Sequence, residues 1–427
     1  MGENPRIVGA IVGALRFSDA TPEKLRSLGD REWHELLEYA DLSHLTLALG
    51  INCRAYLPQW VRERIDHNAC DNRQRWKLIR STYEEVRSAF ISADVQHVVI
   101  KGFAQCPDYA PSPQTRFQSD IDLYCPDKSL NCAVETLRQI GYETVVTSEK
   151  ADHLPVMIRR GDWKWRGNSY DPEMPPSIEL HRVFWNYPRM RFGPSDLQQY
   201  WVRRTVRRVD GMTYPALQPV DNLGFSALQV LRDLLNNALS AHKVFELAYF
   251  LHHKANDDGF WHEWTLSQDD ELRACEAISF YLAHECFGCD LAPQAVEQIA
   301  IVPRMVRAWI PIYGHQSMST HRSSEKDAVW IHQALVNSVR DKLAVLRNGF
   351  LRTPDPYRVL VESAEVERGG RWMRYGFYAL KRLPRHALSI PRMLYRGVRT
   401  LLATIHAGRN MKKRLDETSG LDLKSSA

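Results

Sequence analysis

Two aspartates separated by a single residue, Asp120 and Asp122, are the sequence feature with the clearest chemical meaning. Ile121 and Leu123 alternate with them, as expected of a strand over 120–125 with one buried face. In an extended strand both carboxylates lie on the same side, and their mutual repulsion requires a nearby cation. Mg²⁺ suits this position because it binds carboxylates together with substrate phosphates. A lone Asp-x-Asp also fits a sheet edge with two solvated aspartates, so the flanking sequence must decide.

The flanking sequence predicts more strands around the aspartate pair. Residues 97–100 are a short apolar run, which indicates a buried strand, and Lys101-Gly102 after it indicates a turn. Residues 177–184 predict another strand, and it carries a third carboxylate at Glu179. The sequence therefore predicts an acidic cluster that is built by neighbouring strands.

These pieces together resemble a known family. The run VVIKGFAQCPDYAPSPQTRFQSDIDLY resembles a poorly characterised branch of the polymerase-β-like nucleotidyltransferases. Members of that branch carry a Lys-Gly turn, a Tyr, the motif Arg-x-x-x-Asp-Ile-Asp-Leu and a later acidic-Leu-His strand. The resemblance covers about residues 30–260. It implies an α+β fold: a mixed β-sheet core of nucleotidyltransferase type with flanking helices, a helical N-terminal cap and a mostly helical C-terminal half.

The resemblance also implies the metal ligands. Asp120 and Asp122 would bridge two Mg²⁺ ions, with Mn²⁺ as the alternative, and Glu179 would complete the metal on the acceptor side and help to deprotonate the acceptor. Glu179 stands where Asp is commoner in the superfamily, and its side chain is one methylene longer. The predicted catalytic and metal-binding set is therefore Asp120, Asp122 and Glu179.

The residues implied for nucleotide binding surround this set. Gly102 would let the backbone approach the phosphates, although Phe103 follows it where most of the superfamily has Ser or Gly. Two cations, Lys101 and Arg116, would meet the triphosphate. For Lys243 we keep two interpretations: a triphosphate-binding cation on a helix behind the sheet, or half of a surface pair with Glu246. His181 is either a contact for nucleotide or acceptor, or a structural histidine.

The implied activity is transfer of an NMP group from an NTP, ATP by default, to a hydroxyl group with release of pyrophosphate. The acceptor would be a glycan precursor, a peptide, a protein or an RNA end. One alternative is a non-catalytic protein that uses this fold to bind a nucleotide or partner. Another is a peripheral membrane or nucleic-acid adaptor that acts through the C-terminal segment.

The C-terminal segment has an unusual charge. The chain carries 56 Lys and Arg against 51 Asp and Glu. Thirteen of the basic residues fall within 368–414, which has no acidic residue, so the remainder has 43 basic against 51 acidic residues. Aromatic and apolar residues are interleaved with these charges over 365–415. Such a segment can lie on an anionic membrane surface, bind nucleic acid, or pack on the acidic body of the protein.

Composition and pattern suggest a domain organisation. Eight cysteines in 427 residues make no disulfide scaffold, and Cys286-Phe-Gly-Cys289 has no partner pair, so we expect buried thiols in a reducing, bacterial-type cytoplasm. The protein could also be peripheral at the inner face of the membrane. We expect an N-terminal helical region at 1–95, a catalytic α/β domain at 96–215, a helical domain at 216–350, a basic amphipathic segment at 351–415 and a disordered tail at 416–427.

Four local predictions complete this picture. The apolar N-terminal run within 6–17 predicts a packed helix, and an apolar stripe predicts a helix over about 70–93. Residues 153–176 suggest a β-hairpin, either solvated or acting as a lid over the site. Asp221 is expected to cap a helix that runs to about 237.

Overall fold

A computed structural model describes residues 5–145, 152–318, 327–350 and 390–405. A mixed sheet lies at its centre, which confirms the predicted α+β class. The strands are β1 (Val98–Val99), β2 (Asp120–Tyr124), β3 (Tyr142–Thr144), β4 (Met157–Arg159), β5 (Ser177–His181), β6 (Thr205–Val209) and β7 (Met212–Ala216). Their order across the sheet is β3-β4-β5-β2-β1-β7-β6. β2 pairs in parallel with β5 and β1 with β7, whereas the other neighbours are antiparallel.

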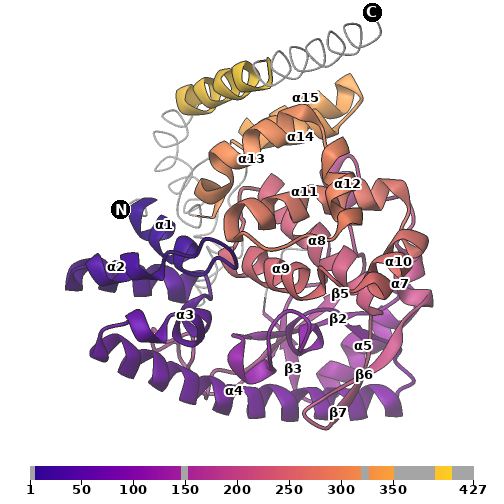
Figure 1. The fold of residues 1–427 in the computed structure, drawn as a ribbon. Coiled ribbons are helices and arrows are strands. Elements are labelled where there is room, and N and C mark those ends of the chain that lie inside the picture. The colour runs from indigo at the N-terminus through magenta and orange to yellow at the C-terminus, as the bar shows by residue number, and fades with distance from the viewer. Residues whose placement is uncertain (1–4, 146–151, 319–326, 351–389, 406–427) are drawn as a thin grey trace, which may run out of the picture.

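Helices surround the sheet and make up most of the remaining described chain (Figure 1). The α-helices are α1 (Pro5–Ala14), α2 (Asp30–Leu42), α3 (Thr46–Asn52), α4 (Gln59–Ser92), α5 (Asp127–Gln139), α6 (Tyr187–Met190), α7 (Gln198–Val202), α8 (Pro219–Leu235), α9 (Ala241–Lys254), α10 (Asp258–Ser267), α11 (Asp270–Phe287), α12 (Pro293–Ile301), α13 (Arg304–Ser317), α14 (Val329–Leu335) and α15 (Val339–Phe350). A further helix spans 390–405. Short 3₁₀ turns are η1 (Pro22–Ser27), η2 (Arg54–Tyr56), η3 (Gly102–Gln105) and η4 (Pro113–Thr115).

The two faces of the sheet pack into different hydrophobic clusters. Ile121 and Leu123 of β2 point into one cluster, together with the apolar stripe of α4 and residues of α5. Tyr124 of the same strand joins the other cluster, which the helices on the opposite side form. Since side chains alternate along a strand, Asp120 and Asp122 share the face of Tyr124. The acidic pair therefore faces the helical half of the molecule.

The helix that carries the apolar stripe is longer than predicted. α4 begins at Gln59 rather than near residue 70 and runs below the sheet (Figure 1). Its first two turns bury Val61 and Ile65 in the cluster of the helical half, whereas residues from Trp76 onward pack on the sheet. The helix thus passes from one core to the other. Because its packing partner changes along its length, the apolar stripe does not reveal where the helix begins.

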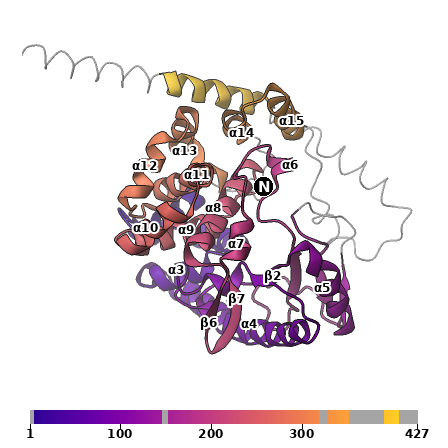
Figure 2. The same cartoon turned by 90° about the vertical axis from the view of Figure 1, so that its right-hand side faces the viewer.

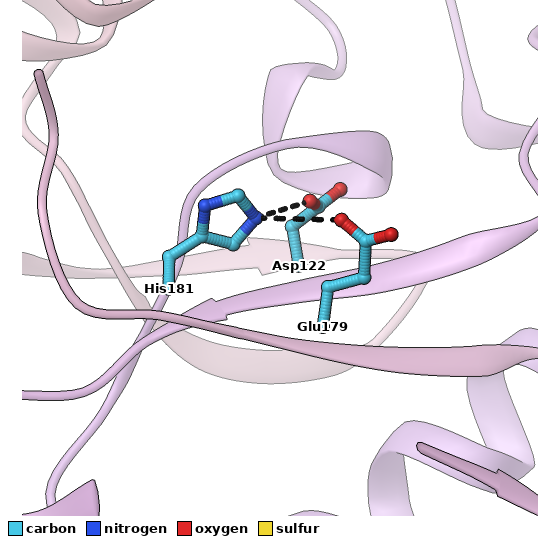
Figure 3. Close-up of side chains that lie close together, drawn as sticks. All are labelled: Asp122, Glu179 and His181. Atoms are coloured by element: carbon cyan, nitrogen blue, oxygen red, sulfur yellow. Dashed lines mark hydrogen bonds and ion pairs between the residues drawn. The ribbon is translucent and has the colours of Figure 1, made fainter. Parts of the chain in front are cut away.

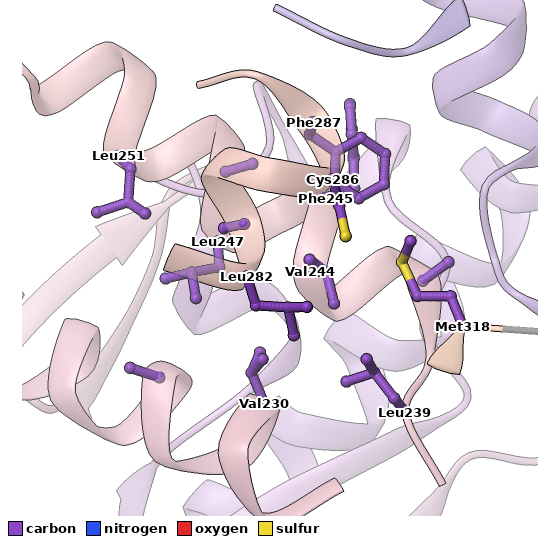
Figure 4. Close-up of a cluster of buried hydrophobic side chains, with 14 of the residues drawn as sticks. Val230, Leu239, Val244, Phe245, Leu247, Leu251, Leu282, Cys286, Phe287 and Met318 are labelled. Atoms are coloured by element: carbon purple, nitrogen blue, oxygen red, sulfur yellow. The ribbon is translucent and has the colours of Figure 1, made fainter. Parts of the chain in front are cut away.

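The helical half is built around α8, α9 and α11. Fifteen of the 17 residues of α8 are buried, as expected of a helix enclosed on several sides. Its Val230 packs against Val244 of α9 and Leu282 of α11 in one cluster (Figure 4). Cys286 and Cys289 are buried, free thiols in the same cluster. These helices pack together on the side of the sheet toward which the acidic pair points.

The N-terminal helices belong to this same cluster. Ile11 and Val12 of α1 are fully buried in it, as are Leu36 and Leu37 of α2. The predicted packed helix at the N-terminus is therefore confirmed. The apolar residues that mark it are covered by helices that lie more than 200 residues later in the chain.

Two local predictions are wrong. Residues 153–176 form no hairpin: β4 lies in the sheet between β3 and β5, and its Arg159 pairs with Glu85 on α4. Asp221 does not cap α8, which begins at Pro219; it is fully buried inside the first turn and forms an ion pair with Arg203. In both cases contacts with residues far away in the sequence decided the structure, and the local sequence pattern did not.

The C-terminal segment is described only at 390–405. This helix, yellow in Figures 1 and 2, lies beside α14 and α15. The remainder of the basic segment and the expected disordered tail at 416–427 lie outside the described residues. Among the helices that the structure describes, none is long and apolar enough to cross a membrane.

Candidate active site

Two parallel strands at the centre of the sheet carry the acidic group. Asp122 of β2 lies directly opposite Glu179 of β5, and His181 follows two residues later on β5. All three side chains project from the same face, as Figure 3 shows. Nε2 of His181 lies 2.7 Å from Oδ1 of Asp122 and 3.7 Å from Oε2 of Glu179. One ligand atom from each residue lies within 4.8 Å of the others, so this group could hold a metal ion.

A lysine is paired with the acidic group. Lys101 follows β1, and its Nζ donates a hydrogen bond of 2.5 Å to Oδ1 of Asp122. The Asp122 side chain is only 3% exposed. Burial alone raises the pKa of Asp122, but the Lys101 ammonium and the His181 hydrogen bond outweigh it and hold that pKa well below its ordinary value. Asp122 is therefore ionised, and Lys101 is one source of the cation that its position requires.

His181 is a neutral donor to Asp122. Burial, followed by the Lys101 ammonium, lowers the pKa of His181 to about 3. Since a carboxylate can only accept, Nε2 of the neutral ring must carry the proton that Asp122 receives. A nitrogen that donates cannot at the same time ligate a metal. In this arrangement the carboxylates are the better metal ligands, and His181 orients Asp122; a direct contact with nucleotide stays a prediction.

Asp120 lies at the start of β2 on the same face as Asp122. Among the described residues, Asp120 is not part of the compact Asp122–Glu179–His181 group. Its carboxyl is nevertheless close enough to feel them. Burial, and after it the charges of Asp122 and Glu179, raises the pKa of Asp120 to about 7. Lys101 and Arg116 relieve this repulsion only in part. The remaining repulsion between hard oxygen donors fits a site for a divalent cation.

Gly102 is required by close packing at the turn after β1. Its φ is +64°, a conformation that residues with a side chain rarely adopt. A Cβ added there would also lie 2.2 Å from Nε2 of Gln118. Gln118 uses the same nitrogen to bind the carbonyl of Asp120 at 2.6 Å. The missing side chain of Gly102 thus allows Gln118 to fix the start of β2, and its predicted approach to phosphate is a separate hypothesis.

Three predicted cations line one cavity beside the acidic group: Lys101 from the turn after β1, Arg116 from the loop before β2, and Lys243 from α9. Arg116 is bound by Glu246 at 2.8 Å, and Lys243 by Asp233 at 2.6 Å. The cavity is also lined by Gln105, Tyr109, Phe225, Ser226 and Gln229. The fold therefore brings together positive charges from three separate elements.

The interpretation of Lys243 as half of a surface pair is wrong. Glu246, one turn along α9, is buried and pairs with Arg116 instead. Lys243 reaches back to Asp233 on α8, which Arg232 also contacts at 3.0 Å. Burial raises the pKa of Asp233, but Lys243 and Arg232 outweigh it and lower that pKa to about 2. Lys243 therefore keeps a fixed position on the wall of the cavity.

A second cavity adjoins the first across the Arg116–Glu246 pair, which lines both. Its walls are largely aromatic. His44 stacks on Phe117 with ring centroids 4.2 Å apart, and His242 meets His44 edge-on at 5.0 Å. The remaining lining residues are Ala48, Ile51, Asn52, Tyr109, Ala110, Pro111, Thr115, Phe245 and Tyr249. This lining suits a flat organic group, whereas the first cavity suits an anion.

Sequence reasoning missed Arg75, a buried arginine that holds both catalytic strands. It extends from α4 and donates to the carbonyls of Gln118, Asp171 and Met174. Gln118 precedes β2, whereas the other two precede β5. The available signal was an arginine inside the apolar stripe of α4, next to Trp76. A basic residue on a buried face must find hydrogen-bond partners in the core.

His153 was also missed. Its Nε2 lies 3.7 Å from Oε2 of Glu179, and its backbone bridges to His181. It comes from the segment before β4, and its spacing from the motif, 26 residues before Glu179, carries no recognisable pattern. Only the antiparallel return of the chain along β5 brings it to the acidic group.

Comparison with known proteins assigns this chain to a family. The family model described as "uncharacterised nucleotidyltransferase" matches residues 29–288, more than half of the chain. The chain belongs to this family. The residues of this nucleotidyltransferase-family protein that match span every predicted site residue and end at the glycine that terminates α11.

The nucleotidyltransferase-family chain has no match among curated proteins. A solved structure that it matches is an antigenic nucleotidyltransferase-like protein from Paracoccidioides brasiliensis, at 12% sequence identity. That match covers 52% of this chain and 96% of the other, with a TM-score of 0.29.

Proposed function

We propose that this nucleotidyltransferase-family protein transfers an NMP group from an NTP to a hydroxyl acceptor and releases pyrophosphate. The observation that carries the proposal is the position of the acidic group: it lies next to a cavity lined by Lys101, Arg116 and Lys243. Carboxylates can bind a divalent metal, and the neighbouring cations can bind the phosphates of a polyphosphate that carries this metal. ATP is the default donor, and the acceptor classes are those that the sequence suggested.

Asp122 and Glu179, with Asp120 beside them, would hold Mg²⁺, or Mn²⁺ in its place. Mg²⁺ bound there supplies positive charge that stabilises the attacking and leaving oxygens of an in-line displacement. Two ions are expected, because this chemistry requires charge on both sides of the transferred phosphorus.

The protein's own side chains divide the remaining tasks. Lys101, Arg116 and Lys243 bind the phosphates that leave as pyrophosphate, and Lys101 exchanges its bond to Asp122 for one to phosphate. Glu179 accepts the proton of the attacking hydroxyl. A bond forms between the hydroxyl oxygen and the α-phosphorus, while the bond from that phosphorus to the bridging oxygen breaks. Neutral His181 holds Asp122 in place throughout.

One observation favours a second candidate function, nucleotide binding without transfer. Lys101 already neutralises Asp122 at 2.5 Å, and a protein that keeps this pair when nucleotide arrives would bind the phosphates without a metal. This candidate predicts NTP binding that is insensitive to chelators, whereas the first predicts a labelled product that requires Mg²⁺.

The test is to incubate the full-length protein with each labelled NTP and Mg²⁺ and to look for any labelled product. Asp122→Asn should lower transfer about 100-fold or more, because it removes charge from the metal site. The control is Asp127→Asn, an exposed aspartate at the start of α5, which should leave transfer unchanged. An active Asp122→Asn protein with unchanged Mg²⁺ dependence would contradict the site assignment.

A second pair of variants tests the cation-lined cavity. Lys243→Ala should raise the KM for NTP, since Lys243 lines the cavity proposed to bind the phosphates. Lys254→Ala on the same helix is the matched control, because Lys254 pairs with Asp257 at 2.7 Å and does not line the cavity. Equal KM values for the two variants would remove Lys243 from the site.

A further inference from the structure

The helix at 390–405 packs on the rest of the protein through a face that carries few large apolar residues. Its buried residues are Met393, Arg396, Gly397 and Thr400, of which only Met393 is a large apolar residue. Helices on protein surfaces normally turn their apolar stripe inward and their charged residues outward. This helix instead buries Arg396 and leaves its apolar stripe exposed, which requires an explanation.

Specific contacts fix this orientation. Arg396 forms a buried ion pair with Asp327, and Nε1 of Trp330 donates to the carbonyl of Met393 at 2.9 Å. A Cβ added to Gly397 would lie 2.4 Å from the Trp330 ring, so glycine allows the helix to approach that closely. A rotated helix would leave the charges of Arg396 and Asp327 buried without each other, which is costly. The outward face is therefore held outward.

The outward face is almost entirely apolar. Its residues recur at steps of three and four, which places them in one sector of the helix over a length of about 17 Å. They are Leu394 (49% exposed), Tyr395 (67%), Val398 (57%), Leu401 (53%), Leu402 (53%) and Ile405 (43%). A contiguous apolar stripe of this kind indicates a binding surface.

Positive charge lies along one edge of the stripe. Arg392 and Arg399 are exposed and, by the helical period, lie along one edge of it. Residues 368–414 carry 13 Lys and Arg and no Asp or Glu. The neighbouring α15, which packs on this helix through Val345, has exposed Val339 (74%) and Leu343 (61%) beside Arg340 and Arg347. All of these helices lie at one end of the molecule (Figure 2).

We infer that the helix at 390–405 lies in the plane of an anionic membrane surface, with its apolar stripe among the acyl chains and its arginines at the headgroups. Aliphatic side chains need no specific partner there, and the cations gain from anionic lipid. Charge argues against a second copy, because two segments with 13 positive charges each would repel. The helix follows the family-matched residues 29–288, so this surface is an addition to the nucleotidyltransferase fold.

The experiment is vesicle flotation with the full-length protein. Vesicles of phosphatidylcholine with 30% phosphatidylglycerol should carry the protein upward, and vesicles of pure phosphatidylcholine should carry much less. Raising the salt to 1 M should release most of it, because the Debye length then falls to about 3 Å. The triple substitution Leu394→Asn, Leu401→Asn and Leu402→Asn should lower the bound fraction more than about tenfold. Arg392→Gln should lower it roughly fivefold.

Two controls separate this result from misfolding and from generic stickiness. Ile301→Asn changes an isoleucine that is 69% exposed on α12, and it should leave flotation unchanged. Each variant should keep the melting temperature of the wild type, because the altered side chains are on the outward face.

Three outcomes would overturn the inference. If the wild-type protein does not float with anionic vesicles, membrane binding by this helix is excluded. If the protein is a dimer in solution and the triple substitution converts it to a monomer, the stripe is the contact surface for a second copy. If the triple variant unfolds at a lower temperature and the wild type does not float, the stripe packs against other parts of the same chain.

Discussion

Asp120 and Asp122 are two residues apart on one strand, yet the structure gives their carboxyl groups opposite behaviour. Asp122 is bound by Lys101 and His181, and these contacts keep it ionised. Asp120 has no such hydrogen bond to Lys101. Its burial, and after it the charges of Asp122 and Glu179, raises the pKa of Asp120 to about 7. In the metal-free protein the aspartate pair thus contains one permanent anion, Asp122, and one whose charge depends on pH, Asp120.

This difference predicts a pH-dependent stability for the metal-free protein. The pKa of Asp120 rises from 3.8 to about 7 on folding, so the stabilisation that its proton provides is complete below about pH 4 and is lost as the pH rises through 7. Between pH 5 and pH 8 the free energy of unfolding of the wild type should therefore fall relative to that of Asp120→Asn, which has no proton to lose.

Urea denaturation of both proteins at each pH, with chelator present, measures this difference. Excess Mg²⁺ should remove the loss in the wild type, since a bound cation favours the ionised carboxylate. Parallel stability curves for the two proteins without metal would show that Asp120 is already ionised at pH 5.

At the scale of elements, the acidic group depends on the register of two strands. β2 and β5 pair in parallel with Asp122 opposite Glu179, and a shift by one residue would turn one of these side chains to the opposite face. Arg75 of α4 ties the chain before each strand to the same guanidinium. A single helix thereby holds the two halves of the site in register.

Arg75→Ala should therefore weaken both the fold and the site. It removes the partner of three carbonyl groups in the core, and we expect a loss of about 2–4 kcal/mol in the free energy of unfolding. Mg²⁺ affinity should fall as well, because the strands are no longer tied together. Arg73→Ala, two residues away on the exposed side of α4, should change stability by less than about 0.5 kcal/mol. Denaturation and Mg²⁺ titration of both variants give the comparison, and similar results for the two would exclude this role of Arg75.

At the scale of the whole molecule, the protein has a core that extends beyond the region its family defines. α1 precedes the family-matched residues 29–288, yet its Ile11 and Val12 are fully buried and the helix contacts α11 and α13. The predicted domain boundary at 95 lies in the loop between α4 and β1, and the one at 215 lies within β7. The site lies between these clusters, so its geometry depends on both.

Ile11→Ala should consequently destabilise the protein by about 2–5 kcal/mol, although it lies far from the site in sequence. Ile301→Ala, at a position that is 69% exposed, should cost less than about 0.5 kcal/mol. Thermal and urea denaturation of the two variants provide the test. A cost below 1 kcal/mol for Ile11→Ala would mean that α1 contributes little to this core.

The sequence by itself determined the features that depend on the local period of the backbone. Alternation along β2 placed Asp120 and Asp122 on one face and Ile121 and Leu123 on the other, and the stripe of α4 predicted its packing on the sheet. These follow from fixed geometry within a strand or a helix, which any reader of the sequence can apply.

Only the tertiary structure decided which charges meet. Arg116 binds Glu246 across 130 residues, and His153 reaches Glu179 because the chain returns along β5. The same holds for the outward apolar face of the helix at 390–405. Its amphipathic pattern is local, but the direction in which the pattern points is set by the contact of Arg396 with Asp327. Pairing between distant residues depends on how whole elements pack, and no local period records it.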